Sequence, residues 1–350
     1  PAGADSGDPG QSNLQEYPLK RFKVYGMGAA LVDTEIEVRD TELAQLGVDK
    51  GLMTLVDQRR RGELLGALDG HLEKASHASG GSAGNSVLAA ALFGGPCYMS
   101  CRVADDEDGH IYLRDLEAAG IRYPAPQPSA VPTGKCLVLV TPDAERSMNT
   151  FLGASETLSV EQLDPQAIAA SEYLYIEGYL VSSDSGRAAA IRAREIAEDA
   201  GVPVALSFSD PGMVEHFRGG LEAMLGGGVD LLFCNDAEAL AWTGAGDLDG
   251  ALEGLREVAR RIAVTRGADG ALLFDGRQRH AVAAHPVDAV DSNGAGDMFA
   301  GAFLYALTRG EDFPTAGGFA SLAAGTVVSQ WGPRLPTDRY AELRSSYFGT

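Results

Sequence analysis

Beyond Thr157, hydrophobic and polar positions alternate along the chain with two different periods. Short apolar runs such as YLYIEGYLV, PVALSFS and LLFCN are typical of buried strands. Between them lie longer segments such as SGRAAAIRAREIAEDAG, in which apolar residues return at helical spacing. Strands that alternate with helices in this way predict a mainly parallel sheet with helices on both faces, and therefore the α/β fold class.

The N-terminal part of the chain has a different pattern. After the strand-like run FKVYGMGAALVD, the short alternating segments TEIEVR and GLMTLVD predict partly exposed strands, and KCLVLVTPDAERSMNTFLG predicts a β-hairpin that turns at Pro142 and Asp143. We expect these segments, at about 33–57 and 130–153, to form a small strand-rich excursion from one domain that spans 22–350. Residues 1–21 have the composition of a disordered tail, or of one that does not belong to the natural chain.

Composition and charge restrict the classes of partner. The chain has 350 residues, 45% of them hydrophobic, which is enough for a large core. A formal net charge of −21 argues against nucleic acid and against anionic membranes, because both require a basic surface. The cysteines and histidines show neither disulfide-framework nor zinc-site spacing, and the sequence contains neither a membrane-spanning apolar run nor a signal-peptide pattern. We therefore expect a cytoplasmic protein with a small-molecule partner.

The heptapeptide DSNGAGD, at 291–297, leads directly into the apolar segment MFAGAFLYAL. Gly294, Ala295 and Gly296 let the backbone approach a ligand closely, and the helix that begins there directs free N–H groups and its positive dipole end to the same point. Such a turn binds a phosphate without a basic side chain. A carboxylate beside it is explained if it accepts the proton of a hydroxyl that attacks a phosphoryl group, and we assign this role to Asp297. The alternative is an aspartate that only caps the helix.

This heptapeptide resembles the signature Asp-Thr-x-Gly-Ala-Gly-Asp of the ribokinase (PfkB) family of carbohydrate and nucleoside kinases, with serine in place of threonine. Four further motifs occur in the order of that family: the turn GGSAGN, the segment ADDEDG with Ala104 where glycine is usual, NDAE, and VTRGADG. Five motifs in order, between Phe22 and Pro336, make the resemblance specific. It implies a ribokinase-like three-layer α/β/α fold with a mainly parallel central sheet and a small β lid.

Within this family the segments ALVD, MTLVD, PTGKC and ERSMN resemble the branch of adenosine kinases. The resemblance implies a kinase that uses ATP and Mg²⁺ to phosphorylate the 5′-hydroxyl of a purine nucleoside, with adenosine as the expected substrate. The alternatives are an inosine or guanosine kinase and a kinase of ribose or another sugar. A nucleoside-binding regulator without catalysis belongs to a different class, and the intact Gly-Ala-Gly-Asp sequence argues against it.

The resemblance also implies a role for most polar residues that follow predicted strands, where ligands of parallel sheets bind. Asp297 and the turn formed by Gly294, Ala295 and Gly296 would be catalytic. The residues implied for substrate binding are Asp33, Gly80, Gly81, Asn85, Glu177, Arg146 and Tyr179. Those implied for nucleotide binding are Asn235, Glu238, Thr265, Arg266, Gly267 and Asn293. Glu238 would organise Mg²⁺ through water, and Asp291 is the candidate side-chain ligand for a monovalent cation such as K⁺.

Several of these residues have a purely structural alternative. Asp33 could begin a turn, and Asn235 and Glu238 have the spacing of a helix N-cap and its capping-box partner. Arg146, on a hairpin expected to be exposed, could be a surface charge or a lid arginine that closes over phosphates. The sequence also leaves open whether the excursion strands cover a monomer or pair between the subunits of a homodimer.

Overall fold

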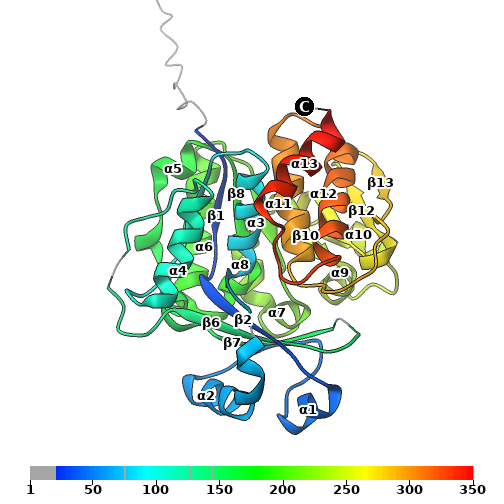
Figure 1. Ribbon diagram of the computed structural model, residues 1–350. Coiled ribbons are helices and arrows are strands. Elements are labelled where there is room, and N and C mark those ends of the chain that lie inside the picture. The colour runs from blue at the N-terminus through cyan, green and yellow to red at the C-terminus, as the bar shows by residue number, and fades with distance from the viewer. Residues whose placement is uncertain (1–20, 75, 127, 144, 350) are drawn as a thin grey trace, which may run out of the picture.

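Two β-sheets form the frame of the molecule (Figure 1). The computed structural model describes residues 21–349 apart from 75, 127 and 144, so the tail expected at 1–21 lies, but for Arg21, outside the described residues. In spatial order, the eight strands of the large sheet are β13 (Arg279–Val282), β12 (Ala271–Phe274), β11 (Ala259–Thr265), β10 (Val229–Asn235), β9 (Val204–Ser207), β8 (Ser171–Glu177), β1 (Phe22–Met27) and β5 (Cys97–Ser100).

The large sheet is parallel from β5 through to β11 and becomes antiparallel only at β12 and β13. Its central strands are continuous apolar runs because both faces are covered by helices. One buried cluster includes residues of α3 (Ser82–Leu92), α4 (Glu107–Ala118), α11 (Ala295–Thr308), α12 (Phe313–Val328) and α13 (Thr337–Phe348). The cluster on the other side includes residues of α5 (Pro165–Ala169), α6 (Asp184–Asp199), α7 (Pro211–His216), α8 (Arg218–Leu225), α9 (Asp236–Thr243) and α10 (Leu248–Leu255). The expected three-layer α/β/α fold is confirmed.

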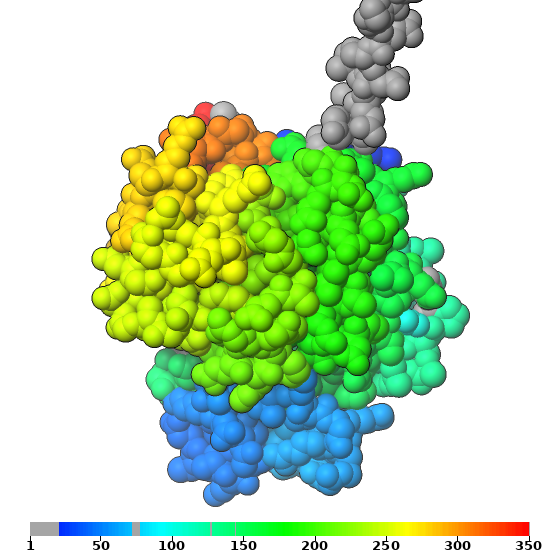
Figure 2. Space-filling view, turned by 180° about the vertical axis from the view of Figure 1, so that it is seen from behind, coloured from blue at the N-terminus to red at the C-terminus, as the bar shows by residue number. Residues whose placement is uncertain are grey.

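The small sheet, which we call the lid, has five strands in the order β3 (Met53–Leu55), β7 (Arg146–Phe151), β6 (Gly134–Val140), β2 (Leu31–Glu37) and β4 (Ser76–Gly80). The predicted hairpin is present as the antiparallel pair β6–β7. β4 lies outside both segments that were expected to form the excursion. Seen from behind, the N-terminal part of the lid projects below the body of the molecule (Figure 2).

The expectation of partly exposed strands is wrong for β2, whose residues are buried apart from Glu37. Two short helices that the sequence pattern did not predict, α1 (Asp40–Gln45) and α2 (Gln58–Ala67), cover one face of the lid. Leu64 of α2 shares a buried cluster with Ile36 of β2 and Leu137 of β6. Because side chains alternate along a strand, the other face of β2 carries Leu31 and Asp33 toward the body.

Helices α3 and α11 lie side by side and both begin at the edge of the large sheet that faces the lid (Figure 1). They approach so closely at Gly301 that a Cβ there would come within 2.3 Å of the Ser86 carbonyl oxygen. This contact brings the first turns of the two helices together. Among the described residues, no helix combines the length and the apolar character that a membrane span requires.

Candidate active site

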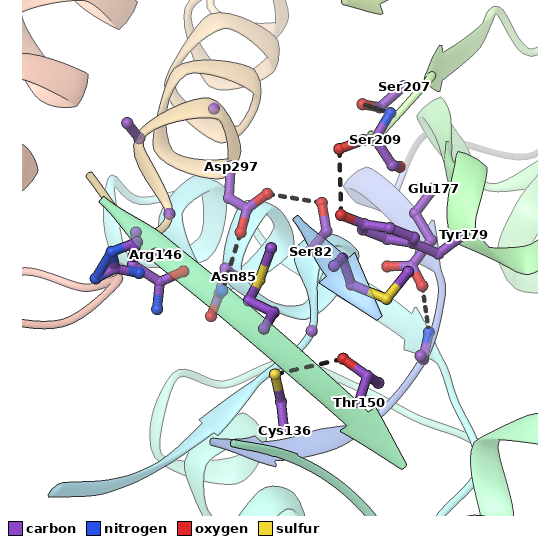
Figure 3. A pocket seen from close by; sticks show the side chains of 18 of the residues that line it. Ser82, Asn85, Cys136, Arg146, Thr150, Glu177, Tyr179, Ser207, Ser209 and Asp297 are labelled. Atoms are coloured by element: carbon purple, nitrogen blue, oxygen red, sulfur yellow. Dashed lines mark hydrogen bonds between the residues drawn. The ribbon is translucent and has the colours of Figure 1, made fainter. Parts of the chain in front are cut away.

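A cavity of about 360 Å³ lies between the lid and the carboxyl ends of the large sheet (Figure 3). Strand ends contribute Glu177 from β8, Ser207 from β9 and Asn235 from β10. The lid contributes Asp33 and Arg146 together with several apolar side chains. The cavity therefore lies at the carboxyl ends of the parallel strands, where the sequence analysis expected a ligand to bind. The cavity is also lined by Gly81, Asn85, Tyr179, Glu238, Thr265, Asn293, Gly294, Ala295, Gly296 and Asp297, all of which the sequence indicated.

The glycine turn begins α11 at one wall of this cavity. Gly294 is the N-cap and has a φ of +70°, a left-handed conformation, and a Cβ on it would lie 2.5 Å from the Cβ of Pro333. Both facts require glycine at this position. At Gly296, by contrast, a Cβ would meet no protein atom within 4 Å, so packing does not require glycine there. The N–H groups of a first helical turn have no partner within the helix, and here that turn lines the cavity.

Asp297 is half-buried and bonds to α3 (Figure 3). Its Oδ1 accepts a hydrogen bond of 2.6 Å from the Ser82 hydroxyl, and its Oδ2 accepts one of 3.0 Å from the Asn85 side-chain amide. The N-cap of α11 is Gly294, so the carboxylate does not cap its own helix. Burial raises the pKa of Asp297, and the hydrogen bonds from Ser82 and Asn85 oppose that rise. The alternative of an N-cap is therefore wrong, and the role of Asp297 as a proton acceptor stays a prediction.

Asp33 is buried on the inner face of the lid and explains the first glycine of the GGSAGN turn. A Cβ on Gly80 would lie 2.1 Å from the Asp33 carboxylate, so glycine is needed there although Gly80 does not itself line the cavity. Gly81, the N-cap of α3, has a φ of +86°. Burial, and next the nearby Glu35, raise the pKa of Asp33 to about 7. A buried carboxylate of this kind is suited to accept hydrogen bonds from substrate hydroxyls.

Glu177 is fully buried and holds two backbone segments in place. Its Oε1 accepts a hydrogen bond of 2.7 Å from the Ala29 amide, and its Oε2 accepts one of 2.8 Å from the Ala83 amide in the first turn of α3. Burial raises the pKa of Glu177 to about 7, while the bonds from Ala29 and Ala83 lower it. The carboxylate therefore joins the β1–β2 connection to α3. Its contact with a substrate hydroxyl stays a prediction.

Asn235 and Glu238 form a complete capping box at the start of α9. The Glu238 amide donates to Asn235 Oδ1 at 2.8 Å, and the Asn235 amide donates to Glu238 Oε2 at 3.0 Å. Both residues also line the cavity, so the structural role does not exclude the metal role. Burial raises the pKa of Glu238 to about 8. A carboxylate that lines the same cavity as the glycine turn of α11 fits Mg²⁺, which keeps most of its waters and binds substrate phosphates.

Arg146 corrects the expectation of an exposed hairpin arginine, because only 6% of its side chain is exposed. It opens β7 on the inner face of the lid, where its guanidinium contacts the Asp291 carboxylate and lies 4.0 Å from Glu35. Burial lowers the pKa of Arg146 to about 10, so the side chain remains charged at neutral pH. The interpretation of Arg146 as a solvated surface charge is wrong.

Asp291 is fully buried and is not part of the cavity lining. Its Oδ1 accepts from the Asn293 amide at 3.1 Å and its Oδ2 from the Gly332 amide at 2.7 Å, in addition to the contact with Arg146. The residues present therefore do not fit a monovalent cation at this carboxylate. Asn293 itself lines the cavity and donates from its side chain to Glu35 at 2.8 Å.

Two nucleotide-binding candidates lie outside the cavity lining. Arg266 faces Asp269, with 3.8 Å between the guanidinium and the carboxylate, and Gly267 follows it in a tight turn with a φ of +52°. Their neighbour Thr265 does line the cavity. Sequence reasoning also missed Ser82, which bonds to Asp297, and Arg334, which bonds to Asn85. Ser82 lies within the GGSAGN turn, where its hydroxyl was the available signal, whereas nothing in WGPRL marked Arg334, whose Nε donates to Asn85 Oδ1 at 3.0 Å.

The fold and the arrangement around Asp297 define a class of phosphoryl-transferring enzymes, and comparison with known proteins agrees. The model of the pfkB family carbohydrate kinases matches residues 54–339, and the chain belongs to this family. It is a phosphotransferase that uses ATP and acts on a hydroxyl group of a small molecule. The motif-based resemblance is thereby confirmed.

Within this family, the chain is similar to adenosine kinases and to a ribose-1-phosphate kinase. The crystal structure of adenosine kinase from Sinorhizobium meliloti has 35% sequence identity and a TM-score of 0.88, over 93% of this chain and 99% of that one. The adenosine kinase of Saccharomyces cerevisiae is 28% identical over 334 residues, which are 89% of this chain and 96% of the yeast protein. An ATP-dependent ribose-1-phosphate kinase from Halopiger xanaduensis is 30% identical over 279 residues, 77% of this chain and 87% of its own.

Replacing Gly296 with alanine should separate activity from stability. No protein atom opposes the added methyl group, and alanine favours a helix over glycine by up to about 1 kcal/mol, so Tm should stay level or rise. The methyl group lies beside the anion-binding amides, so kcat/KM for ATP should fall by more than about tenfold.

Gly294→Ala is the matched comparison, since the left-handed φ costs alanine about 1–2 kcal/mol and its Cβ would overlap Pro333. This variant should lose stability. Unchanged kcat/KM for ATP in Gly296→Ala would show that no ligand approaches this turn.

Proposed function

We propose that this chain transfers the γ-phosphoryl group of ATP to the 5′-hydroxyl of adenosine. The observation that carries the proposal is the Asp297 carboxylate, which stands at the N-terminal end of α11 in the same cavity as Asp33. A proton acceptor and an anion-binding helix end thus face one space with a group suited to ribose hydroxyls. The similarity to adenosine kinases along nearly the whole chain supports the choice of substrate.

In this proposal the lid and the body bind different parts of the reactants. Amides of the turn at 294–296 stabilise the charge on the transferring phosphoryl group, and Asp297 accepts the proton of the attacking hydroxyl. Ser82 and Asn85 hold that carboxylate in position. Mg²⁺, bound through water by Glu238, would neutralise phosphate charge. We also infer that the small sheet closes over the reactants and excludes water from them.

The lining of the lid favours a nucleoside over a free sugar. Its apolar side chains face the cavity next to Asp33, and they come from β2, β3, β7 and the segment after β7: Leu31, Met53, Leu55, Met148 and Leu152. Apolar surface of this kind suits the faces of a flat purine base, whereas ribose alone would leave it uncovered. We place the reaction in purine salvage in the cytoplasm. This location is consistent with the four cysteines, which are all free and buried. The enzyme works as a monomer or a homodimer.

A phosphorylated sugar is the second candidate acceptor. The relative from Halopiger xanaduensis is named for ribose-1-phosphate, and the buried Arg146 offers a positive charge in the cavity that an acceptor phosphate would use. The apolar lid surface argues for adenosine. The values of kcat/KM for adenosine and for ribose-1-phosphate distinguish the two candidate acceptors.

An acceptor panel with ATP and Mg²⁺ tests the substrate. Adenosine should exceed ribose, ribose-1-phosphate and inosine in kcat/KM. Because Asp33 is buried and needs a hydroxyl partner in the complex, 2′-deoxyadenosine should be poorer than adenosine by more than about tenfold. The measurement is ADP release with product identification. A larger kcat/KM for ribose-1-phosphate than for adenosine would overturn the nucleoside assignment and leave the kinase chemistry in place.

Asp297→Asn tests the proton acceptor. The amide keeps the size of the side chain but cannot take a proton, so kcat should fall by about 10² to 10⁴, while ATP binding should change little. Asp338→Asn, in the first turn of α13 and outside the cavity, is the control and should keep wild-type kcat. Retention of more than about half of the wild-type kcat by Asp297→Asn would contradict the mechanism.

Glu238→Gln tests the metal role against the cap. Both oxygens of Glu238 accept hydrogen bonds from Asn235, so the amide loses one of them, at a cost of about 1 kcal/mol. If Glu238 organises Mg²⁺, the Mg²⁺ concentration for half-maximal rate should rise several-fold.

The control for Glu238→Gln is Asp247→Ala, which removes the N-cap of α10. Asp247 is exposed and lies outside the cavity. This variant should lower Tm to a similar extent without changing the Mg²⁺ dependence. Equal Mg²⁺ dependence in both variants would leave Glu238 with the structural role alone.

A further inference from the structure

Arg334 lies between α12 and α13, outside the cavity lining, and its guanidinium reaches three other elements. Its Nε donates to Asn85 Oδ1 of α3 at 3.0 Å. Its Nη1 donates to the Ser79 hydroxyl of β4 at 2.6 Å and to Asp115 Oδ2 of α4 at 3.2 Å. Only 16% of the side chain is exposed. Asn85 therefore bonds to Arg334 through its amide oxygen and to Asp297 through its amide nitrogen.

The position of Asn85 between two partners leaves it one orientation. Arg334 can only donate hydrogen bonds, and the ionised Asp297 carboxylate can only accept them. The Asn85 carbonyl must then face Arg334 and its NH₂ group must face Asp297, at 3.0 Å from Oδ2. A flipped amide would set two donors against each other on one side and two acceptors on the other. Without the arginine, this choice would no longer be enforced.

We propose that Arg334 is a positioning residue for phosphoryl transfer, which fixes the amide orientation of Asn85 and through it the Asp297 carboxylate. The inference rests on the proposed function, since it takes Asp297 as the proton acceptor. The segment that carries Arg334 also supports the glycine turn, because Pro333 lies against Gly294. Gln330 donates from its side chain to the Arg334 carbonyl at 2.6 Å and so holds the segment itself.

The charge of Arg334 acts in the same direction as its geometry. Arg334 favours the ionised form of Asp297, which burial opposes. Other titratable groups interact with Asp297 from the elements around it: Asp33 on β2, Tyr175 and Glu177 on β8, and Tyr179 directly after β8. Those groups are acidic or phenolic, so Arg334 provides compensating positive charge near a crowded carboxylate.

The first experiment measures the carboxyl group directly. The Asp297 resonance is assigned in ¹³Cγ-aspartate-labelled protein by its loss in Asp297→Asn, and it is titrated in the wild type and in Arg334→Met. Removing the positive charge and releasing the amide should both raise the pKa of Asp297, by about 0.5 or more. An unmoved titration would overturn the inference. This readout needs no turnover, so it stands even if every acceptor fails and the proposed function falls.

The second experiment uses kinetics with adenosine and ATP. A base must be deprotonated, so the rate is lost as pH falls through its pKa, and a raised pKa moves the acid limb of kcat/KM to higher pH. Arg334→Met should shift this limb upward and lower kcat by about tenfold or more, whereas in an Asn85→Ala background the same change should cost less than about twofold. An equal loss of kcat in both backgrounds, with an unshifted acid limb, would mean that Arg334 does not act through Asn85 and would overturn the inference.

Arg344→Met is the matched control. Arg344 also comes from the C-terminal region and also binds α3, but it donates to the Phe93 carbonyl, at the end of the helix remote from Asp297, at 2.9 Å. This variant should lower Tm without shifting the acid limb. A shift of the same size in Arg344→Met would assign the effect to loosening of α3 in general and overturn the specific role of Arg334.

Discussion

The site depends on one contact between two helices: the pair of hydrogen bonds by which Ser82 and Asn85 of α3 hold the Asp297 carboxylate of α11. The turns that begin α3 and α11 both line the cavity, and in the proposed function they face the substrate and the phosphate. The close packing of the two helices at Gly301 keeps the two first turns in register. A displacement of either helix would therefore move Asp297 relative to both turns, and the close approach at Gly301 is possible only with glycine.

Electrostatics in the cavity are dominated by carboxylates whose charged forms are disfavoured by burial. Asp33, Glu177, Glu238 and Asp297 all have raised pKa values, and the first three are raised into the range of about 7 to 8. Among the described residues that line the cavity, Arg146 is the one basic side chain. In the proposed function, anion binding would therefore rely on backbone amides and the helix dipole, which add positive potential without adding a titratable group.

The sequence predicted the layers of the fold because the strands and helices of the large sheet carry clear periods. It also located most of the cavity, since Asp33, Asn85, Asn235 and Asp297 belong to local motifs. It failed where the decisive partner is distant along the chain. A hairpin pattern does not show that Asp291 lies opposite Arg146, and so it predicts an exposed arginine. The contact with Arg146 is likewise absent from the local pattern around Asp291.

The order of the elements along the chain sets when the site can form during biosynthesis. Asp33 leaves the ribosome early, Asp297 follows much later, and Arg334 emerges only with the segment before the last helix. Strand β1 likewise waits for β5 and β8 before it has both of its neighbours in the sheet. A nascent chain thus exposes the apolar inner face of the lid before the body can cover it. Until the body has formed, this face is an apolar surface of the kind that makes folding intermediates prone to aggregation.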